Sequence, residues 1–441
     1  MSLSTFLTEP IFHDPEQKAH FEDNAIIQAM LQVEAALARA QAQLGIIPDN
    51  AATAITDGVS TINISVDELV KSVGKSGVPV PALVDAMRQH IGKPTADWIH
   101  FGATSQDIVD TAMVIRASEA LKDIARHLGA LIDQLHQESD KHAETLCMAR
   151  TRGQLATPTT LGVRIAAWSR PLIMAENEIE SVTERVLEVQ LAGASGNRTA
   201  LGSQANQVAD QMAQELGLRA GSPWHTDRSS ILIMSSWLHR IVAALAKMGG
   251  DLQLAARNEI GEMQAGHGGK SSTMPHKSNP VVAESLGSIA HVVSGLLSSL
   301  NTSSIHAEDR DGRNWSVEWY VLPQLFSLTG AALKKAHYLV ESLQVDTGAM
   351  RTRIDQSPVV MAESAVFALI ESVGRETATA DMKKAMASAK PLAQSLCELG
   401  HTDIDWDHVL NPANCIASCR AVIEDVFAAR KSQNVIARTS Y

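Results

Sequence analysis

"VIRASEALKDIARHLGALIDQL", residues 114–135, carries apolar side chains at steps of three and four without a break. The stripe consists of Val114, Ala117, Leu121, Ile124, Leu128, Leu131 and Leu135. This spacing predicts one long amphipathic helix over about 112–142. Similar stripes run over about 24–44, 159–192, 229–264, 280–304 and 313–344. We therefore predict an all-α protein whose long helices bury their apolar faces against one another or against other copies of the chain.

The composition agrees with this fold class and narrows the range of partners. Hydrophobic residues make up 45% of the 441 residues but aromatic residues only 4%, which favours helices because strands prefer aromatic and β-branched residues. The formal charge is 37 − 49 = −12, so we expect neither nucleic acid nor a membrane surface as a partner. The first residues lack the basic and apolar parts of a secretion signal. We expect a cytoplasmic protein.

Two features could suggest a metal site or a membrane span. The four cysteines form no CxxC pair, so neither a disulfide framework nor a zinc site is expected. No Asp, Glu, Lys or Arg occurs between Glu284 and Glu308, which is long enough to cross a membrane. Serines, glycines and two histidines fill that stretch, so we predict a helix buried inside protein.

The lengths of the expected elements change along the chain. Shorter elements and more turn residues occur up to about residue 110 and again from about residue 346. We predict three domains: an N-terminal helical domain over 1–110, a central long-helix bundle over 111–345, and a C-terminal helical cap over 346–441.

A polar loop, "GHGGKSSTMPHKSNP" at residues 266–280, interrupts the central domain. Its Gly-Lys-Ser run is similar to the end of a P-loop, but that motif requires a glycine where this chain has Gln264, which disfavours a phosphate cradle. We expect Ser278 or Asn279 to cap a helix that begins at Pro280.

The same loop contains the residue types for proton transfer at a carbon next to a carboxylate. Lys277 would lie beside the positive end of the following helix, where an anion is favoured. A serine oxygen of Ser271 can reach the carbon while Lys277 and Asn279 hold the carboxylate, whose charge increases when the proton leaves.

Two further polar stretches lie at the boundaries of long helices. In "WIHFGATSQDIVDT", residues 98–111, Thr104 or Ser105 can cap the next helix with Asp107 as its reciprocal partner. Capping alone explains this stretch, and the alternative is that its hydroxyls and exposed amides bind a carboxylate. "ARTRGQLATPTT", residues 149–160, places two arginines and a glutamine in a loop before a buried helix.

These three stretches resemble the active-site segments of the fumarase/aspartase superfamily. "SSTMPHKSNP" matches every fixed position of its Ser-Ser-x-Met-Pro-x-Lys-x-Asn-Pro signature. "HFGATSQDIVDT" and "RTRGQLATPTTLG" match the other two segments in the expected order. Within the superfamily, "SGVPVPALV", "LAGASGNRTALGS", "PWHTDRS" and "WSVEWYVLP" are similar to the bacterial 3-carboxy-cis,cis-muconate cycloisomerases, and the resemblance covers nearly the whole chain.

The resemblance implies an all-helical fold with three domains, a homotetramer built on the central helices, active sites shared among three subunits, and no cofactor. It implies that Ser271 transfers the proton at carbon. The implied substrate-binding residues are Lys277 and Asn279 for one carboxylate of a small polycarboxylate, and Thr104, Ser105, His100 and Gln154 for another.

The chain departs from the superfamily pattern at two places. Lys270 precedes the signature where the family usually has glycine, and the second departure lies in the second segment. Lyases that release an amine or hydroxide carry a general-acid histidine directly after the threonine of the second segment, where this chain has Arg152. A carboxylate leaving group needs no such acid, and Arg152 could orient a third carboxylate.

We therefore expect a cycloisomerase that converts 3-carboxy-cis,cis-muconate to carboxymuconolactone in aromatic-acid (protocatechuate) catabolism. Two alternatives stay open. One is a fumarate-releasing C–N lyase of the adenylosuccinate or argininosuccinate type, and the other is an inactive structural protein on the same fold.

Overall fold

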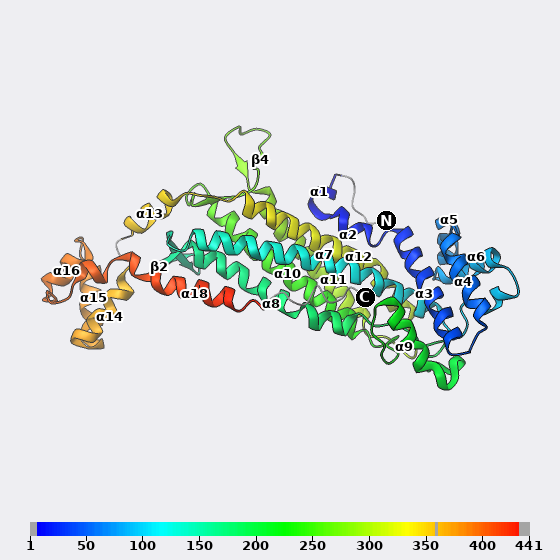
Figure 1. Ribbon diagram of the computed structural model, residues 1–441. Helices are drawn as coiled ribbons and strands as arrows, with labels where there is room; N and C mark the ends of the chain where they lie inside the picture. Colours follow the sequence, from blue (N-terminus) through cyan, green and yellow to red (C-terminus); the bar gives the residue numbers. More distant parts are fainter. Residues whose placement is uncertain (1–6, 358–359, 432–441) are drawn as a thin grey trace.

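The computed structural model describes residues 7–357 and 360–431, and its centre is a bundle of long helices (Figure 1). The bundle helices are α7 (Ser105–Lys141), α8 (Leu161–Val186), α10 (Ser229–Ala255), α11 (Val281–Ser303) and α12 (Gly312–Glu341). The predicted stripe of α7 faces the interior, since Leu121, Leu128 and Leu135 are each at most 1% exposed. The predicted all-α class is confirmed.

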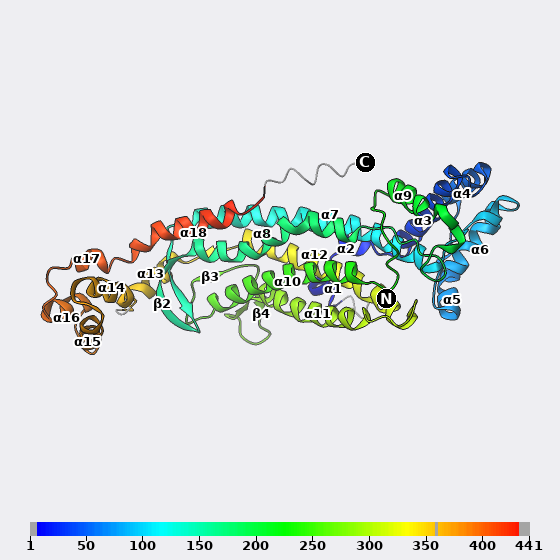
Figure 2. The same cartoon turned by 90° about the horizontal axis from the view of Figure 1, so that it is seen from below.

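Two short helices, α1 (Glu9–Phe12) and α2 (Pro15–Ala19), lie along the side of the bundle against α12, and other shorter helices lie at its two ends (Figures 1 and 2). Those that precede α7 at one end are α3 (Asp23–Gln43), α4 (Asp49–Thr61), α5 (Val66–Ser76) and α6 (Val80–Ile91), and α9 (Ala205–Leu216) packs with α3. Those after α12 are α13 (Thr347–Asp355), α14 (Ala362–Val373), α15 (Arg375–Met386), α16 (Leu392–Glu398), α17 (Trp406–Val409) and α18 (Ile416–Ala428).

The buried apolar residues fall into separate clusters that follow this arrangement. The largest joins the five bundle helices with α18, which returns from the far end to pack on α8. A second cluster joins α3, α4, α6, α9 and the start of α7. A third lies among α14 to α17. The exact domain boundaries predicted at 110 and 346 stay a prediction.

Short strands occur only at the turns between long helices in the described parts of the chain. β1 (Leu146–Thr151) and β2 (Gln154–Thr160) form an antiparallel hairpin between α7 and α8. β3 (Met263–Gln264) pairs with β6 (Gln344–Val345), and β4 (Gly269–Lys270) pairs with β5 (Ser278–Asn279). The stretch 149–160, which we expected to be a loop, is therefore mostly strand.

α10 and α11 are long and apolar enough to cross a membrane by length and composition alone. α10 lies inside the bundle against α8, α11 and α12, which accounts for its composition. In α11 only 28% of the most apolar window is buried within the chain, so the prediction of a fully buried helix is wrong for the single chain. Its exposed positions include small residues such as Ser294, Gly295 and Ser298.

Candidate active site

The first predicted segment lies where α7 begins. Thr104 is the N-cap residue and Ser105 the first helical residue, and Thr104 and Asp107 form the predicted capping box. The Asp107 carboxylate accepts the N–H of Thr104 at 3.0 Å, and also those of Ala192 at 2.7 Å and Gly193 at 3.0 Å. The buried carboxylate thus fixes the helix start against the 192–193 segment.

His100 precedes this helix start and is paired with a buried carboxylate. Its Nδ1 lies 2.6 Å from Oε1 of Glu34, whose side chain is 1% exposed. Burial by itself would lower the pKa of His100, but the charge of Glu34 and the hydrogen bond to it outweigh burial and raise the pKa above 6.5. His100 has φ 63°, in the left-handed region that few non-glycine residues adopt.

Arg310 contacts the same helix start, and our sequence analysis assigned it no role. Its guanidinium donates to Thr104 Oγ1 at 3.1 Å, to Gln106 Oε1 at 3.2 Å and to the carbonyl of Gly193 at 3.1 Å. These three acceptors are neutral. They fix the direction of the Arg310 guanidinium but do not neutralise its positive charge. An arginine beside two hydroxyls and a helix N-terminus is an arrangement that favours a carboxylate.

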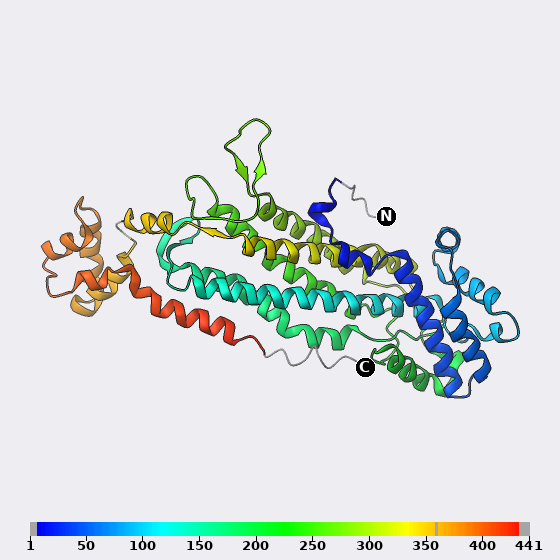
Figure 3. The same cartoon turned by 45° about the horizontal axis from the view of Figure 1, so that its top comes forward.

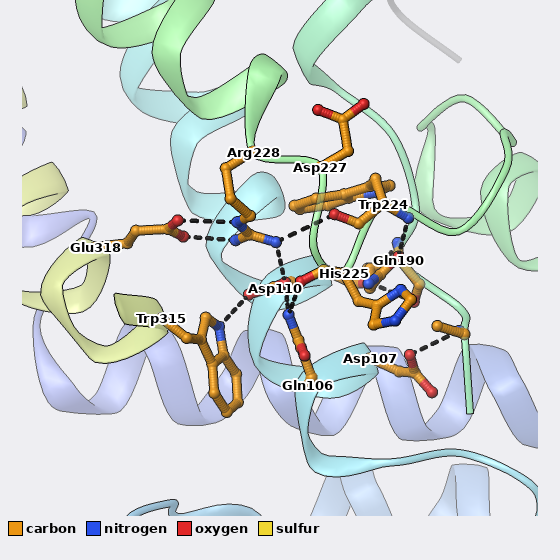
Figure 4. Close-up of polar contacts among 12 residues, drawn as sticks. Gln106, Asp107, Asp110, Gln190, Trp224, His225, Asp227, Arg228, Trp315 and Glu318 are labelled. Atoms are coloured by element: carbon orange, nitrogen blue, oxygen red, sulfur yellow. Dashed lines mark hydrogen bonds and ion pairs between the residues drawn. The ribbon is translucent and has the colours of Figure 1, made fainter. Parts of the chain in front are cut away.

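A buried ionic network supports this segment from behind (Figure 4). Arg228 donates to both oxygens of Glu318, at 2.8 and 2.5 Å, and to Asp110 Oδ2 at 2.8 Å. All three side chains are at most 4% exposed. The two carboxylates outweigh burial and raise the pKa of Arg228. The network therefore joins α7, the start of α10 and α12 at one point.

The network reaches the helix start through one more residue. Gln106 donates to Asp110 Oδ2 at 3.1 Å and to the carbonyl of His225 at 2.8 Å, which leaves its oxygen to accept from Arg310 (Figure 4).

Burial and the charge of Arg310 lower the pKa of His225. Its ring packs on Gly196, where a Cβ would lie 2.1 Å from the ring carbon Cε1, so only glycine fits there.

The second predicted segment forms the tip of the β1–β2 hairpin. Thr151 pairs with Gln154, and the two residues between them, Arg152 and Gly153, have φ 54° and 81°. Positive φ at both positions is the pattern of a type I′ turn, whose twist matches that of the strands. Arg152 and Gln154 are both exposed at this tip in the single chain.

Arg150, the other arginine of this segment, forms an ion pair with Glu262. It donates from Nη1 to Oε2 of Glu262 at 2.8 Å and from Nη2 to Oε1 at 2.5 Å, and the Glu262 side chain is fully buried. The hydrogen bond with Glu262 raises the pKa of Arg150. Arg150 is thus engaged in the structure, whereas Arg152 projects from it.

The third predicted segment projects from the bundle as the β4–β5 hairpin (Figures 1 and 3). The predicted helix cap is wrong: α11 begins at Val281 with Pro280 as its N-cap residue and no side-chain cap, because Ser278 and Asn279 pair with β4 instead. Lys277 is exposed on the loop.

Ser271 lies in a turn of this loop with its hydroxyl near two backbone amides. Oγ accepts from the N–H of Met274 at 3.0 Å and from that of Thr273 at 3.4 Å. Amides that point at a serine oxygen stabilise negative charge there. The sequence pattern did not reveal this arrangement of amides.

One chain does not bring the three segments together. The first segment lies at the start of α7 and the second follows its end, and α7 has 37 residues, so about 55 Å separate them at 1.5 Å per residue. The hollow beneath the loop, which Asn279 lines, is about 50 Å³, far below the several hundred Å³ typical of a small-molecule site. A hollow of about 340 Å³ between α3, α5 and α12 has an apolar lining and contains none of the predicted site residues.

Comparisons with known proteins agree with the fold. The model of a protein family described as lyase matches residues 13–295, more than half of the chain. The chain therefore belongs to this lyase family and is an enzyme of the fumarase/aspartase superfamily, of the lyase or cycloisomerase type.

Individual relatives narrow this class. The chain is 34% identical to 3-carboxy-cis,cis-muconate cycloisomerase of Pseudomonas aeruginosa, over 96% of both chains. It is 29% identical to adenylosuccinate lyase of Methanocaldococcus jannaschii, over 95% of this chain and 94% of that protein. The crystal structure of 3-carboxy-cis,cis-muconate lactonizing enzyme from Pseudomonas putida superposes with a TM-score of 0.87 at 33% identity, covering 97% of this chain and 99% of that one.

Proposed function

We propose that the protein is a cycloisomerase that converts 3-carboxy-cis,cis-muconate to carboxymuconolactone, a step of aromatic-acid catabolism. The observation that carries the proposal is the combination of an intact Ser271 loop with Arg152 in place of the general-acid histidine. The relatives named as cycloisomerases support it, because the similarity extends over nearly the whole chain.

The chemistry requires cations and one proton carrier. A carboxylate oxygen adds across a conjugated double bond, the C–O bond forms as the π bond breaks, and the neighbouring carbon takes a proton. In the reverse direction Ser271 removes that proton, which leaves a dianionic aci-carboxylate. Lys277 and Asn279 would bind this group, and the amides of Thr273 and Met274 support the charge on Ser271 Oγ.

The remaining carboxylates of the triacid would be held at the other two segments. Thr104, Ser105 and Arg310 offer two hydroxyls and an oriented guanidinium at a helix start, with His100 nearby. Arg152 and Gln154 are exposed at the hairpin tip, where they are free to meet a ligand.

A complete site would need more than one copy of the chain. The distance of about 55 Å along α7 keeps the first two segments apart, so we infer active sites shared among subunits of a homotetramer. The exposed small residues of α11 suit close packing of helices from different copies.

A spectrophotometric assay tests the proposal. The purified protein, without added cofactor, is mixed with 3-carboxy-cis,cis-muconate and the conjugated-diene absorbance is followed. Rapid loss of absorbance is the expected result.

The relative named adenylosuccinate lyase favours one competing function, a fumarate-releasing C–N lyase. Rising fumarate absorbance with N-substituted aspartates, and none of the diene loss, would establish that function instead. No turnover of either substrate class, with the oligomer intact, would favour the inactive structural protein.

A further inference from the structure

Glu262 is a fully buried carboxylate at the base of loop 266–280. Arg150 clamps both of its oxygens, at 2.8 and 2.5 Å, and the guanidinium of Arg164 lies 3.8 Å from Oε2. Arg164 is itself held by the carbonyl of Met148, to which it donates at 2.9 Å. The carboxylate is thus bound by one arginine from the hairpin and approached by another from α8.

The backbone around Glu262 is held as firmly as its side chain. Its carbonyl accepts from the N–H of Asp346 at 3.0 Å, and β3, which begins at the next residue, pairs with β6. Gly266 N–H donates to Ser342 Oγ at 2.7 Å, and His267 N–H to Tyr338 Oη at 3.1 Å. The loop is therefore anchored to the end of α12 as far as His267.

Among the described residues, the loop beyond His267 is held by hydrogen bonds within the loop itself. β4 pairs with β5, and Ser271 accepts from the amides that follow it. The direction in which Ser271 and Lys277 project is therefore set where the loop leaves its anchored base.

Arg150 lies at the base of the second segment, as Glu262 lies at the base of the third. It lies in β1 next to a register irregularity, and it is followed by the turn that presents Arg152 and Gln154. The ion pair therefore joins the stem of one predicted site segment to the base of another.

We propose that the Arg150–Glu262 pair, supported by Arg164, is a positioning device that fixes the hairpin turn 151–154 and the base of loop 266–280 relative to each other. The inference rests on the proposed function, which gives both segments their roles. A two-pronged arginine–carboxylate contact fixes direction as well as distance. Such a buried pair can be replaced by apolar residues without loss of stability. We therefore assign the pair a role in placing the two segments and not in stabilising the fold.

The decisive variant is the double substitution Arg150→Met with Glu262→Met, which removes both charges and keeps the volume. Arg150→Lys and Glu262→Gln are the conservative single variants. Arg39→Met is the matched control, because it removes a 2.6 Å arginine–glutamate pair at the opposite end of the molecule. Each variant is first checked for folding by circular dichroism and for oligomer size.

Two readouts are compared with wild type. The first is kcat and KM with 3-carboxy-cis,cis-muconate, where we expect the double variant to lose at least about tenfold in kcat with a smaller change in KM. The second is the rate of tryptic cleavage after Lys270 and Lys277, which are both exposed. We expect this rate to rise several-fold in the double variant. Arg150→Lys should fall between wild type and the double variant, and Arg39→Met should match wild type.

A folded double variant with wild-type kcat and wild-type cleavage of the loop would overturn the proposal. If the wild-type protein does not turn over the triacid, the proposed function fails, and the cleavage rates alone then decide whether the pair fixes the loop.

Discussion

Ser271 combines a position in a projecting loop with a preorganised environment for negative charge. Its Oγ accepts from the Met274 and Thr273 amides, so the charge of an alkoxide would be partly compensated before substrate arrives. The position of Ser271 in a polar loop was predictable from the sequence. The direction of two amides toward one oxygen was not predictable, because it depends on the turn that the backbone adopts.

Ser271→Ala should therefore abolish turnover while leaving the oligomer folded. We expect a loss of about a thousandfold or more in kcat, because the proton carrier is removed. Ser278→Ala, at a variable position of the signature in the same loop and exposed, is the control and should stay near wild type. Activity of Ser271→Ala within about tenfold of wild type would contradict the assignment.

Arg152 is exposed at the hairpin tip and is a proposed ligand of a substrate carboxylate. Arg152→Ala should raise KM for the triacid by about tenfold or more if the guanidinium binds a carboxylate, since a charged hydrogen bond contributes about 1.5–3 kcal/mol. Arg170→Ala, an exposed arginine on α8, serves as control. Unchanged KM would remove Arg152 from substrate binding.

The His100–Glu34 pair makes a pH-dependent contribution to stability. The pKa of His100 is raised in the folded state, so this contribution is fully present below pH 6.5 and is lost as the pH rises through the folded-state pKa. Asparagine tolerates the left-handed conformation of residue 100.

His100→Asn should therefore lower the unfolding free energy more at about pH 6 than at about pH 9. Urea denaturation of wild type and variant at the two pH values measures this difference. An equal effect at both values would show that His100 is not charged in the folded protein.

At the scale of elements, periodicity predicted the long helices well and their ends poorly. The stripe that suggested a helix to residue 264 ends at Ala255, because a turn and β3 follow. Ser278 and Asn279 have good capping side chains, but pairing with β4 satisfies their backbone groups instead. A capping residue type is a local feature of the sequence. It does not predict that residues 278–279 pair with a strand from the other side of the loop.

Three of the bundle helices, α7, α10 and α12, meet at Arg228, and substitutions at this position should lower stability. Arg228→Met leaves the carboxylates of Asp110 and Glu318 buried without their partner, which should cost about 3–5 kcal/mol in unfolding free energy. Thermal unfolding measures the loss. Arg240→Met, which removes the exposed pair with Glu178, should cost at most about 1 kcal/mol. A similar small cost at both positions would show that the network is not important for stability.

At the scale of the whole molecule, the separation of the segments predicts complementation between chains. Thr104→Val and Ser271→Ala should each be inactive alone, but mixed oligomers should regain activity because some sites then receive both intact segments. Ser271→Ala mixed with Lys277→Met is the control, since both changes lie in the same loop and no site regains an intact one. If the mixture of Thr104→Val and Ser271→Ala stays inactive, the sites are not shared.

The sequence by itself determined the helical class, the long bundle helices and the three polar segments, because periodicity and short motifs are local properties of the chain. The reaction that we propose also rests on a feature of the sequence, Arg152 in the second segment. The tertiary structure alone decided that Arg310 meets Thr104, that Arg150 is held by Glu262 while Arg152 is exposed, and that about 55 Å separate the first segment from the second in one chain. Those contacts join residues more than a hundred positions apart, so they depend on how the helices pack and leave no periodic trace in the sequence.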